Sequence, residues 1–183
     1  MRTQKNKGAG KTALFVGRFQ PFHLGHARIA KNLLRRYPSL VIGIGSRRQK
    51  RTGQNPFSAQ ERRMLIVKTL AKAEGAKKRV RFAYLEDYRK DEDWAKEVRR
   101  RFSPRQFVAY SGNGRVLRLL KDEGFDIHEI KLLERGRWQG KMIRKRMAHA
   151  REWKKDLPAE IRDWMEKKGL KIIRDCDRAK RME

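Results

Sequence analysis

Short apolar runs alternate along the chain with longer segments in which apolar residues recur at helical spacing. Several of the short runs end at Gly or Ser, and they contain many Val, Ile and Phe residues. This pattern is typical of buried β-strands. We predict five strands, at residues 12–16, 40–44, 80–85, 106–110 and 125–130.

The segments between and beyond these strands predict helices. In the first, Ile29, Leu33 and Leu34 share one face, and Pro38 ends the pattern. In the second, Ser58 and Glu61 have the spacing of a capping box, and a stop is expected near Gly75. The predicted helices cover residues 24–36, 58–75, 92–102 and 116–121, with two more near 141–151 and 158–168.

Strands that alternate with helices predict an α/β fold: a Rossmann-like parallel sheet of about five strands flanked by helices, with a short helical C-terminal extension. We divide the chain into a flexible basic tail at residues 1–11 and a single domain at residues 12–183, of which 133–183 form the helical C-terminal part. In such sheets ligands bind beyond the carboxyl ends of the strands, so the loops that follow the strands are where chemistry is expected.

Composition excludes several classes of protein. The 183 residues include a single cysteine, Cys176, so an internal disulfide or a multi-cysteine zinc site cannot form. No apolar run approaches the roughly 18 residues of a membrane helix, and the basic start lacks the apolar stretch of a signal peptide. We therefore expect a cytoplasmic protein without membrane contact.

Charge points to anionic partners. The formal net charge is +28 and the pI is about 11.1, which favours nucleic acid or phosphorylated metabolites. A solvated basic surface without a specific partner explains the charge equally well. Trp138, Trp153 and Trp164 lie among C-terminal basic residues, an arrangement that single-stranded nucleic acid binding uses. Their helical spacing favours packing into the core instead.

Residues 17–26 carry the strongest chemical signal. They follow the first strand and open the first helix, whose N-terminus offers free N–H groups and a partial positive charge to a phosphate. His23 and His26 are three residues apart, so they share one face of the first turn, and Gly25 leaves the approach open. Arg18 adds a planar cation that suits phosphate oxygens. We predict a nucleotide-phosphate site rather than two incidental histidines.

The same residues, Gly-Arg-Phe-Gln-Pro-Phe-His-Leu-Gly-His, resemble the His-x-Gly-His signature of the nucleotidyltransferase superfamily. In this extended form they are similar to the archaeal nicotinamide-mononucleotide adenylyltransferases. Further segments of that family match in order and spacing: residues 42–46, 55–62, 110–113 and 143–147, and Asp87 with Trp94. The resemblance spans roughly residues 13–170.

The resemblance implies a nucleotidyltransferase that makes NAD and pyrophosphate from ATP and nicotinamide mononucleotide (NMN), with Mg²⁺ carried by ATP and no direct protein ligand for the metal. It implies catalytic roles for His23, His26, Arg18 and Arg144. It implies ATP contacts from Gly17, Phe19, Gln20, Gly25, Ser111, Gly112, Asn113 and Lys141. It implies acceptor contacts from Asp87, Asp91 and Trp94, and a homo-oligomer.

Four positions depart from the family's pattern. Residues 139–144 keep the arginine of its Ser-x-Thr-x-x-Arg element, but Gln139 and Lys141 replace the two hydroxyl residues. Asp91 stands where an asparagine is usual, and a carboxylate cannot donate a hydrogen bond to a carboxamide oxygen. Gln54 occupies a basic loop position. Two alternatives stay open: the same chemistry on another phosphorylated acceptor, or a nucleotidyltransferase-like fold that serves as an RNA- or ribonucleoprotein-binding module.

Overall fold

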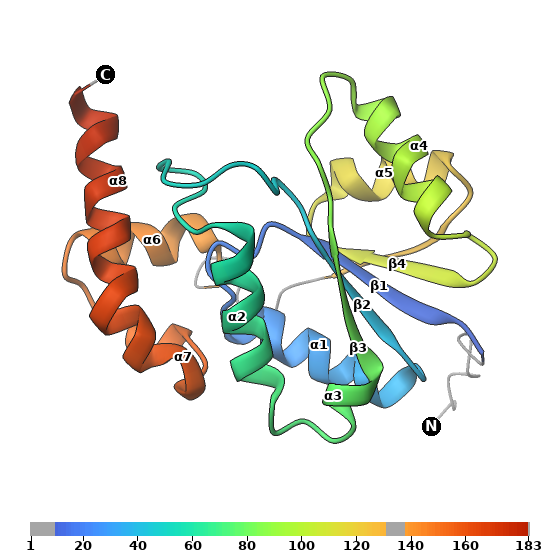
Figure 1. Ribbon diagram of the computed structural model, residues 1–183, viewed down its shortest axis with the longest axis horizontal. Helices are drawn as coiled ribbons and strands as arrows, with labels where there is room; N and C mark the ends of the chain where they lie inside the picture. Colours follow the sequence, from blue (N-terminus) through green and yellow to red (C-terminus); the bar gives the residue numbers. More distant parts are fainter. Residues whose placement is uncertain (1–9, 131–137, 183) are drawn as a thin grey trace.

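The computed structural model describes residues 10–130 and 138–182, and its centre is a five-stranded parallel sheet (Figure 1). The strand order is β3-β2-β1-β4-β5. The chain therefore starts in the middle of the sheet, builds outward to β3, and then returns to the other side of β1. The strands are β1 (Thr12–Gly17), β2 (Leu40–Ile44), β3 (Val80–Tyr84), β4 (Phe107–Ser111) and β5 (Asp126–Glu129).

Helices cover both faces of the sheet because successive residues of β1 point to opposite sides. Ala13 and Phe15 join one hydrophobic cluster, whereas Leu14 and Val16 join another. The first cluster is covered by α1 (Leu24–Arg36), α2 (Ala59–Leu70) and the short α3 (Ala76–Arg79). The second is covered by α4 (Asp91–Arg101) and α5 (Gly114–Asp122), which lie together above the sheet in Figure 1.

The C-terminal part packs against α2 rather than against the sheet (Figure 1). A third hydrophobic cluster joins Phe57 and Leu65 to Ile143, Ile161 and Ile173. Since Ile66 faces the first cluster, α2 is buried on two sides. The C-terminal elements are α6 (Gly140–Ala148), the 3-10 turn η1 (Lys154–Asp156), α7 (Ala159–Trp164), the π-helical turn η2 (Met165–Gly169) and α8 (Leu170–Met182).

The fold class predicted from the sequence is confirmed, and all five predicted strands form. The predicted helix over residues 58–75 was too long, because α2 ends at Leu70. Gly75, with φ +67°, then precedes the separate helix α3. The predicted helix over 158–168 was too short. It continues through η2 into α8, which the sequence pattern did not predict. Most of the predicted tail, residues 1–9, lies outside the described residues, but the Lys11 ammonium is 2.6 Å from an Asp126 carboxylate oxygen.

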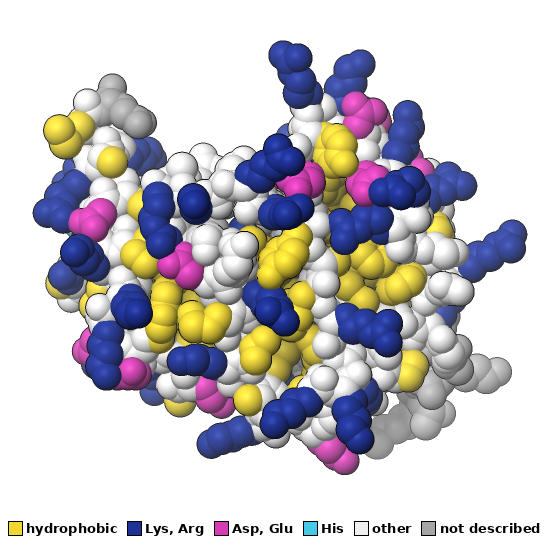
Figure 2. Space-filling model, viewed as in Figure 1, with side chains coloured by type: hydrophobic (Ala, Val, Ile, Leu, Met, Phe, Trp, Pro, Cys, Tyr) yellow, Lys and Arg dark blue, Asp and Glu magenta, His cyan; other side chains and the backbone are white. Residues whose placement is uncertain are grey.

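Two of the C-terminal tryptophans pack in the core, as their spacing predicted. Trp153 is 6% exposed and Trp164 lies against the third cluster, where its ring meets Phe57 edge-on. Basic side chains cover much of the surface shown in Figure 2, and acidic ones are few. No helix in the described ranges is long and apolar enough to cross a membrane.

Candidate active site

A cavity of about 280 Å³ opens at the carboxyl ends of β1 and β4, where the strand order reverses. Its walls are the loop after β1, the loop after β4 and the start of α6. It brings together all four predicted catalytic residues, Arg18, His23, His26 and Arg144, and seven of the predicted ATP contacts: Gly17, Phe19, Gln20, Ser111, Gly112, Asn113 and Lys141. Gly25 is buried within the first turn of α1 and is not part of the cavity wall.

The two histidines form the start of α1. His23 is the N-cap: its Nδ1 accepts the backbone N–H of His26 at 3.4 Å, and Nδ1 of His26 accepts the backbone N–H of His23 at the same distance. The two rings stack with centroids 3.6 Å apart. This reciprocal arrangement is a capping box built from imidazoles. Because Nδ1 of His23 is an acceptor, the proton of its neutral ring is on Nε2.

Burial keeps both rings neutral. His23 is 2% exposed, and desolvation lowers its pKa to about 3, against a small opposing effect of Asp156. Burial also lowers the pKa of His26 well below its usual value; the neighbouring His23 adds to this and a hydrogen bond with the Pro21 backbone opposes it. The ring of His26 lies against Phe19 and Phe22. The pair therefore offers hydrogen bonds rather than positive charge to a ligand.

Positive charge in the cavity comes from arginine and lysine. Arg144 is half-buried and donates to the backbone oxygens of Gly53 (3.1 Å) and Gln20 (2.7 Å). Burial and the charge of Arg18 lower the pKa of Arg144 to about 10, so it remains a cation at neutral pH. Arg18 contacts Gln54 Oε1 at 3.4 Å. Among the described residues neither arginine has a carboxylate partner, which leaves both charges to an anionic ligand.

Glycine and a left-handed residue shape the loop after β1. Phe19 has φ +53°, and this turns its ring back over Gly17. A Cβ at Gly17 would lie 2.9 Å from that ring, so only glycine fits there without displacing it. Gln20 lines the cavity, but its amide is already used: Nε2 donates to Phe57 O at 2.8 Å and Oε1 accepts from Phe57 N at 3.0 Å. Its side chain joins this loop to the start of α2.

The loop after β4 is also held by its own side chains. Ser111 Oγ accepts the backbone N–H of Asn113 at 3.1 Å, and Asn113 Oδ1 caps α5 by accepting from Arg115 N at 3.0 Å. A Cβ at Gly112 would meet nothing within 4 Å. The loop therefore presents an open stretch of backbone to the cavity.

Arg62 is a site residue whose role the sequence analysis missed. Its side chain is completely buried, and it donates to the backbone oxygens of Arg18 (2.8 Å), Gly45 (2.6 Å), Ser46 (2.9 Å) and Ser58 (3.2 Å). One guanidinium thus joins the loops after β1 and β2 to the start of α2. Burial lowers its pKa to about 10.

The start of α6 supplies two further residues that spacing did not reveal. Gly140 approaches the loop after β1 so closely that a Cβ would lie 2.8 Å from Gln20 O. Trp138 lines the cavity, and its buried Nε1 has no hydrogen-bond partner among the described residues. Gln139, the N-cap of α6, makes no side-chain cap, so the first N–H groups of this helix have no side-chain acceptor there.

The predicted acceptor residues stand apart from these walls. Asp87 accepts from Ser46 Oγ (3.1 Å) and Gln49 Nε2 (2.9 Å) beyond the end of β3. Asp91, at the start of α4, pairs with Arg115 of α5. Trp94 is partly buried against the cluster that α4 and α5 cover. These three positions stay predictions, outside the cavity that holds the histidines.

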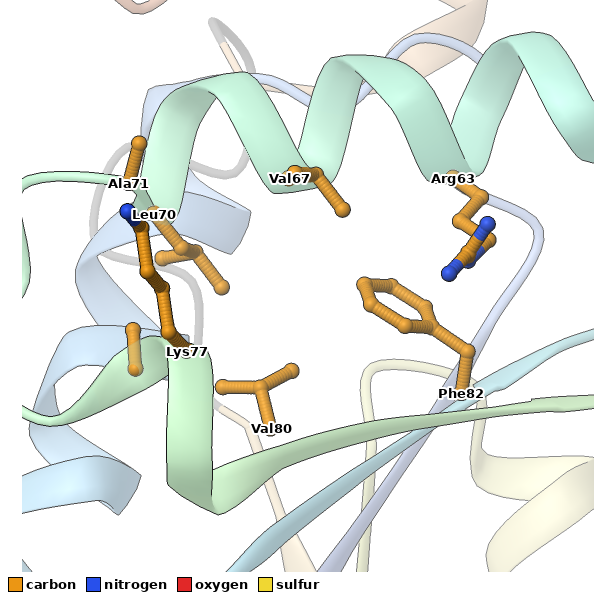
Figure 3. Close-up of a pocket in the computed structure, with 8 residues that line it drawn as sticks. Arg63, Val67, Leu70, Ala71, Lys77, Val80 and Phe82 are labelled. Carbon is orange, nitrogen blue, oxygen red and sulfur yellow. The ribbon is translucent and has the colours of Figure 1, made fainter.

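A second cavity, of about 250 Å³, lies between α2 and β3, an edge strand (Figure 3). Val67, Leu70, Val80 and Phe82 line it, and the Arg63 guanidinium lies 5.3 Å from the centre of the Phe82 ring. These walls are mainly aliphatic and aromatic. They offer little to a phosphate, so we place the candidate active site at the histidines.

Comparison with known proteins identifies the family of this chain. A cytidylyltransferase-like family model matches residues 14–175. Among curated relatives, the nicotinamide-nucleotide adenylyltransferase of Archaeoglobus fulgidus is 36% identical over 89% of this chain and 95% of its own. The enzyme of the same name from Thermoplasma volcanium is 33% identical over 90% of this chain and 86% of its own. The chain belongs to the archaeal nicotinamide-nucleotide adenylyltransferase family.

Solved nucleotidyltransferase structures share the fold of this adenylyltransferase family member. A bifunctional NMN adenylyltransferase/ADP ribose pyrophosphatase from Francisella tularensis, complexed with AMP and a manganese ion, has a TM-score of 0.73 at 20% identity. The match covers 90% of this chain and 52% of that one, about half its length. A Plasmodium falciparum nicotinic acid mononucleotide adenylyltransferase has a TM-score of 0.58 at 13% identity. That match covers 88% of this chain and 96% of the Plasmodium chain.

Proposed function

We propose that this protein catalyses adenylyl transfer from ATP to NMN, forming NAD and pyrophosphate. The observation that carries the proposal is the single cavity in which two neutral, stacked histidines face two arginines without carboxylate partners. The names of the archaeal relatives support the same reaction. A module that only bound polyanions would have no need of buried histidines.

In this reaction an oxygen of the NMN phosphate attacks the α-phosphorus of ATP. The bond from that phosphorus to the oxygen bridging to the β-phosphorus breaks, and pyrophosphate leaves with the electron pair. Such transfer depends on positioning and on donors aimed at the developing charge. We assign the α-phosphate to His23 and His26, and the leaving phosphates to Arg18, Lys141 and Arg144.

The adenosine end of ATP would lie along the loop after β4, where residues 111–113 expose backbone groups, and Trp138 Nε1 offers a further donor. The described cavity walls carry no carboxylate, and no group of three metal-ligating residues is found in the described part of the chain. Mg²⁺ would therefore enter with ATP, bound to its phosphate oxygens, and neutralise charge on the leaving group. The protein's cations and the N-terminus of α6 do the rest of the neutralisation.

We assign the acceptor site to the side of β1 that faces β3. Asp87, Asp91 and Trp94 would contact the acceptor there. Asp91 pairs with Arg115, so its charge is partly compensated. An acceptor whose carboxamide NH₂ donates to Asp87 or Asp91 fits these groups better than one that carries a carboxylate. We expect NMN to be used better than nicotinate mononucleotide.

The surface charge supports weak, non-specific nucleic acid binding as a secondary property, which would fall steeply with salt. A homo-oligomer, implied by the family resemblance, stays a prediction. Sedimentation at two salt concentrations measures it.

The test is NAD formation from ATP, Mg²⁺ and NMN, with nicotinate mononucleotide, FMN and no acceptor as parallel reactions. The informative variant is His23→Asn, because asparagine is a good N-cap and keeps an acceptor for His26 N while the imidazole N–H donor is lost. We expect kcat to fall by about 10²–10³-fold, the usual effect of removing one such donor. His149→Asn, an exposed histidine on the C-terminal side of α6, is the matched control.

The outcomes separate the hypotheses. NAD formation that His23→Asn abolishes and His149→Asn leaves intact supports the proposal. Product only with FMN or another acceptor keeps the ATP site and changes the substrate. No product with any acceptor from a folded protein would make the RNA-binding module the better explanation.

A further inference from the structure

A third and larger cavity, which we call the chamber, adjoins the candidate active site. Its volume is about 470 Å³, and it shares Arg18, Lys141 and Arg144 with the histidine cavity. Residues of the loop before α2, of α6 and of α8 form its other walls. The two arginines therefore stand at a boundary, with the histidines on one side and this chamber on the other.

The chamber collects positive charge that no ion pair within the described part of the chain balances. Lys145 and Lys180 line it in addition to the three shared cations. None of these five makes an ion pair with a residue of the described ranges. The one carboxylate in the wall, Asp177, accepts from Arg181 at 2.8 Å. Like charges gathered in a concave site repel one another, so an anion that binds there is strongly favoured.

Gly53 joins the two ends of this cluster. Its carbonyl oxygen accepts from Arg144 Nε at 3.1 Å, and a Cβ at Gly53 would lie 3.2 Å from Lys180 Cδ. The aliphatic part of the Lys180 side chain therefore passes over Gly53, the residue whose carbonyl oxygen accepts from Arg144. α8 in this way brings a cation to the phosphate end of the site, where Gln54 also lines the chamber.

We propose that this chamber receives phosphates beyond the γ position, so that the protein accepts adenosine 5′-polyphosphates longer than ATP as adenylyl donors. The proposal rests on the function proposed above and extends it. With adenosine 5′-tetraphosphate, an oxygen of the NMN phosphate attacks the α-phosphorus. The bond to the oxygen bridging to the β-phosphorus breaks, and tripolyphosphate leaves with that oxygen and its electron pair. Lys145 and Lys180 bind the added phosphate.

The chamber favours a polyphosphate chain over other anions because it adjoins the cavity in which the triphosphate would lie. The two cavities share Arg18, Lys141 and Arg144, so a phosphate chain that runs from His23 to these residues ends beside the chamber. An added phosphate brings negative charge to Lys145 and Lys180, which form no ion pair with the residues that the structure describes. A separate anion bound in the chamber would instead compete with the triphosphate for the two shared arginines.

The kinetic test compares ATP with adenosine 5′-tetraphosphate, each with Mg²⁺ and NMN. We expect the wild-type protein to use the tetraphosphate with a kcat/KM within about tenfold of that for ATP, since no described residue closes the chamber. In the double variant Lys145→Gln/Lys180→Gln, the ratio of the two kcat/KM values should fall by about tenfold, as expected for two exposed charge contacts. Lys168→Gln, an exposed lysine outside the chamber, is the matched control.

A binding test keeps the proposal independent of turnover. Calorimetry should show tripolyphosphate binding about tenfold more tightly than pyrophosphate, with the preference lost in the double variant and kept in Lys168→Gln. Equal affinity for the two anions, an unchanged kinetic ratio in the double variant, or no use of the tetraphosphate by a protein active with ATP would each overturn the proposal. Binding preference without turnover of either donor would instead reject the proposed function and leave the chamber assigned.

Discussion

Acid should destabilise this protein through its two buried histidines. Both rings stay neutral in the folded protein, because burial lowers the pKa of His23 to about 3 and that of His26 well below its usual value. In the unfolded chain the same rings titrate near pH 6.5. Below that pH the unfolded state binds more protons than the folded state, so the free energy of unfolding must fall as the pH falls.

The size of the effect for His23 follows from linkage. At pH 5 the His23 ring, with a native pKa of about 3, binds almost no proton, whereas the unfolded ring is almost fully protonated. Between pH 8 and pH 5 His23 then removes about 2 kcal/mol of stability, and His26 adds to the loss in the same direction. The stabilisation is complete above pH 6.5 and is lost progressively down to the native pKa.

The assay is urea unfolding of the wild-type protein and of His23→Asn at pH 8 and pH 5. Carboxylates and surface groups titrate alike in both proteins, so they cancel in the difference. We expect acidification to cost His23→Asn about 2 kcal/mol less than the wild type. The exposed His149→Asn should lose as much as the wild type. If His23→Asn and the wild type lose the same stability, the idea that His23 is kept neutral by burial is refuted.

Three substitutions test the framework around the cavity. Arg62→Met removes the donor that serves four backbone oxygens and should lower the free energy of unfolding by about 3–5 kcal/mol in urea titrations. Gly140→Ala places a Cβ against Gln20 O, which should displace α6, cost about 1–3 kcal/mol and raise the KM for ATP. Arg144→Lys keeps the charge but loses the fork that reaches two carbonyl oxygens, and should raise the KM for ATP about tenfold in steady-state kinetics.

Two of these have a control variant, and the third has an outcome that refutes it. Arg63 is the exposed neighbour of Arg62, and Arg63→Met should lower the free energy of unfolding far less than Arg62→Met. An equal loss would show that the four hydrogen bonds of Arg62 matter little. A Cβ at Gly114 meets nothing within 4 Å, so Gly114→Ala should be tolerated; if Gly140→Ala is tolerated as well, the close approach of α6 is not a constraint. An unchanged KM in Arg144→Lys would remove Arg144 from the phosphate site.

The parts of the fold that were predicted correctly carry their signal within a few residues. The strands are short apolar runs, and the Ser58–Glu61 capping box marks the start of α2 in both sequence and structure. The end of α2 and the whole of α8 carry weaker signals. α8 follows a π turn at which Gly169 lies so close to Met165 that a Cβ would be 2.9 Å from its sulfur, and this packing cannot be read from residue order.

The candidate site divides in the same way. His23, His26 and Arg18 are neighbours in the chain, so their spacing was enough to place them together. Arg62 has another arginine beside it and looks like a surface cation in the sequence. Its burial depends on the loops after β1 and β2 meeting at the start of α2. Lys180 is 127 positions from Gly53, and only the packing of α8 brings the two together.

The buried guanidinium of Arg62 has a consequence for motion. Because it holds the loops after β1 and β2 to α2, and the Gln20 amide holds the first loop to Phe57, these segments can shift only as one rigid block. On the opposite side of the cavity, Arg144 is bonded to backbone oxygens that a phosphate can replace as acceptors. Any closure around a bound nucleotide should therefore be a displacement of α6 and α8 toward a wall that stays still.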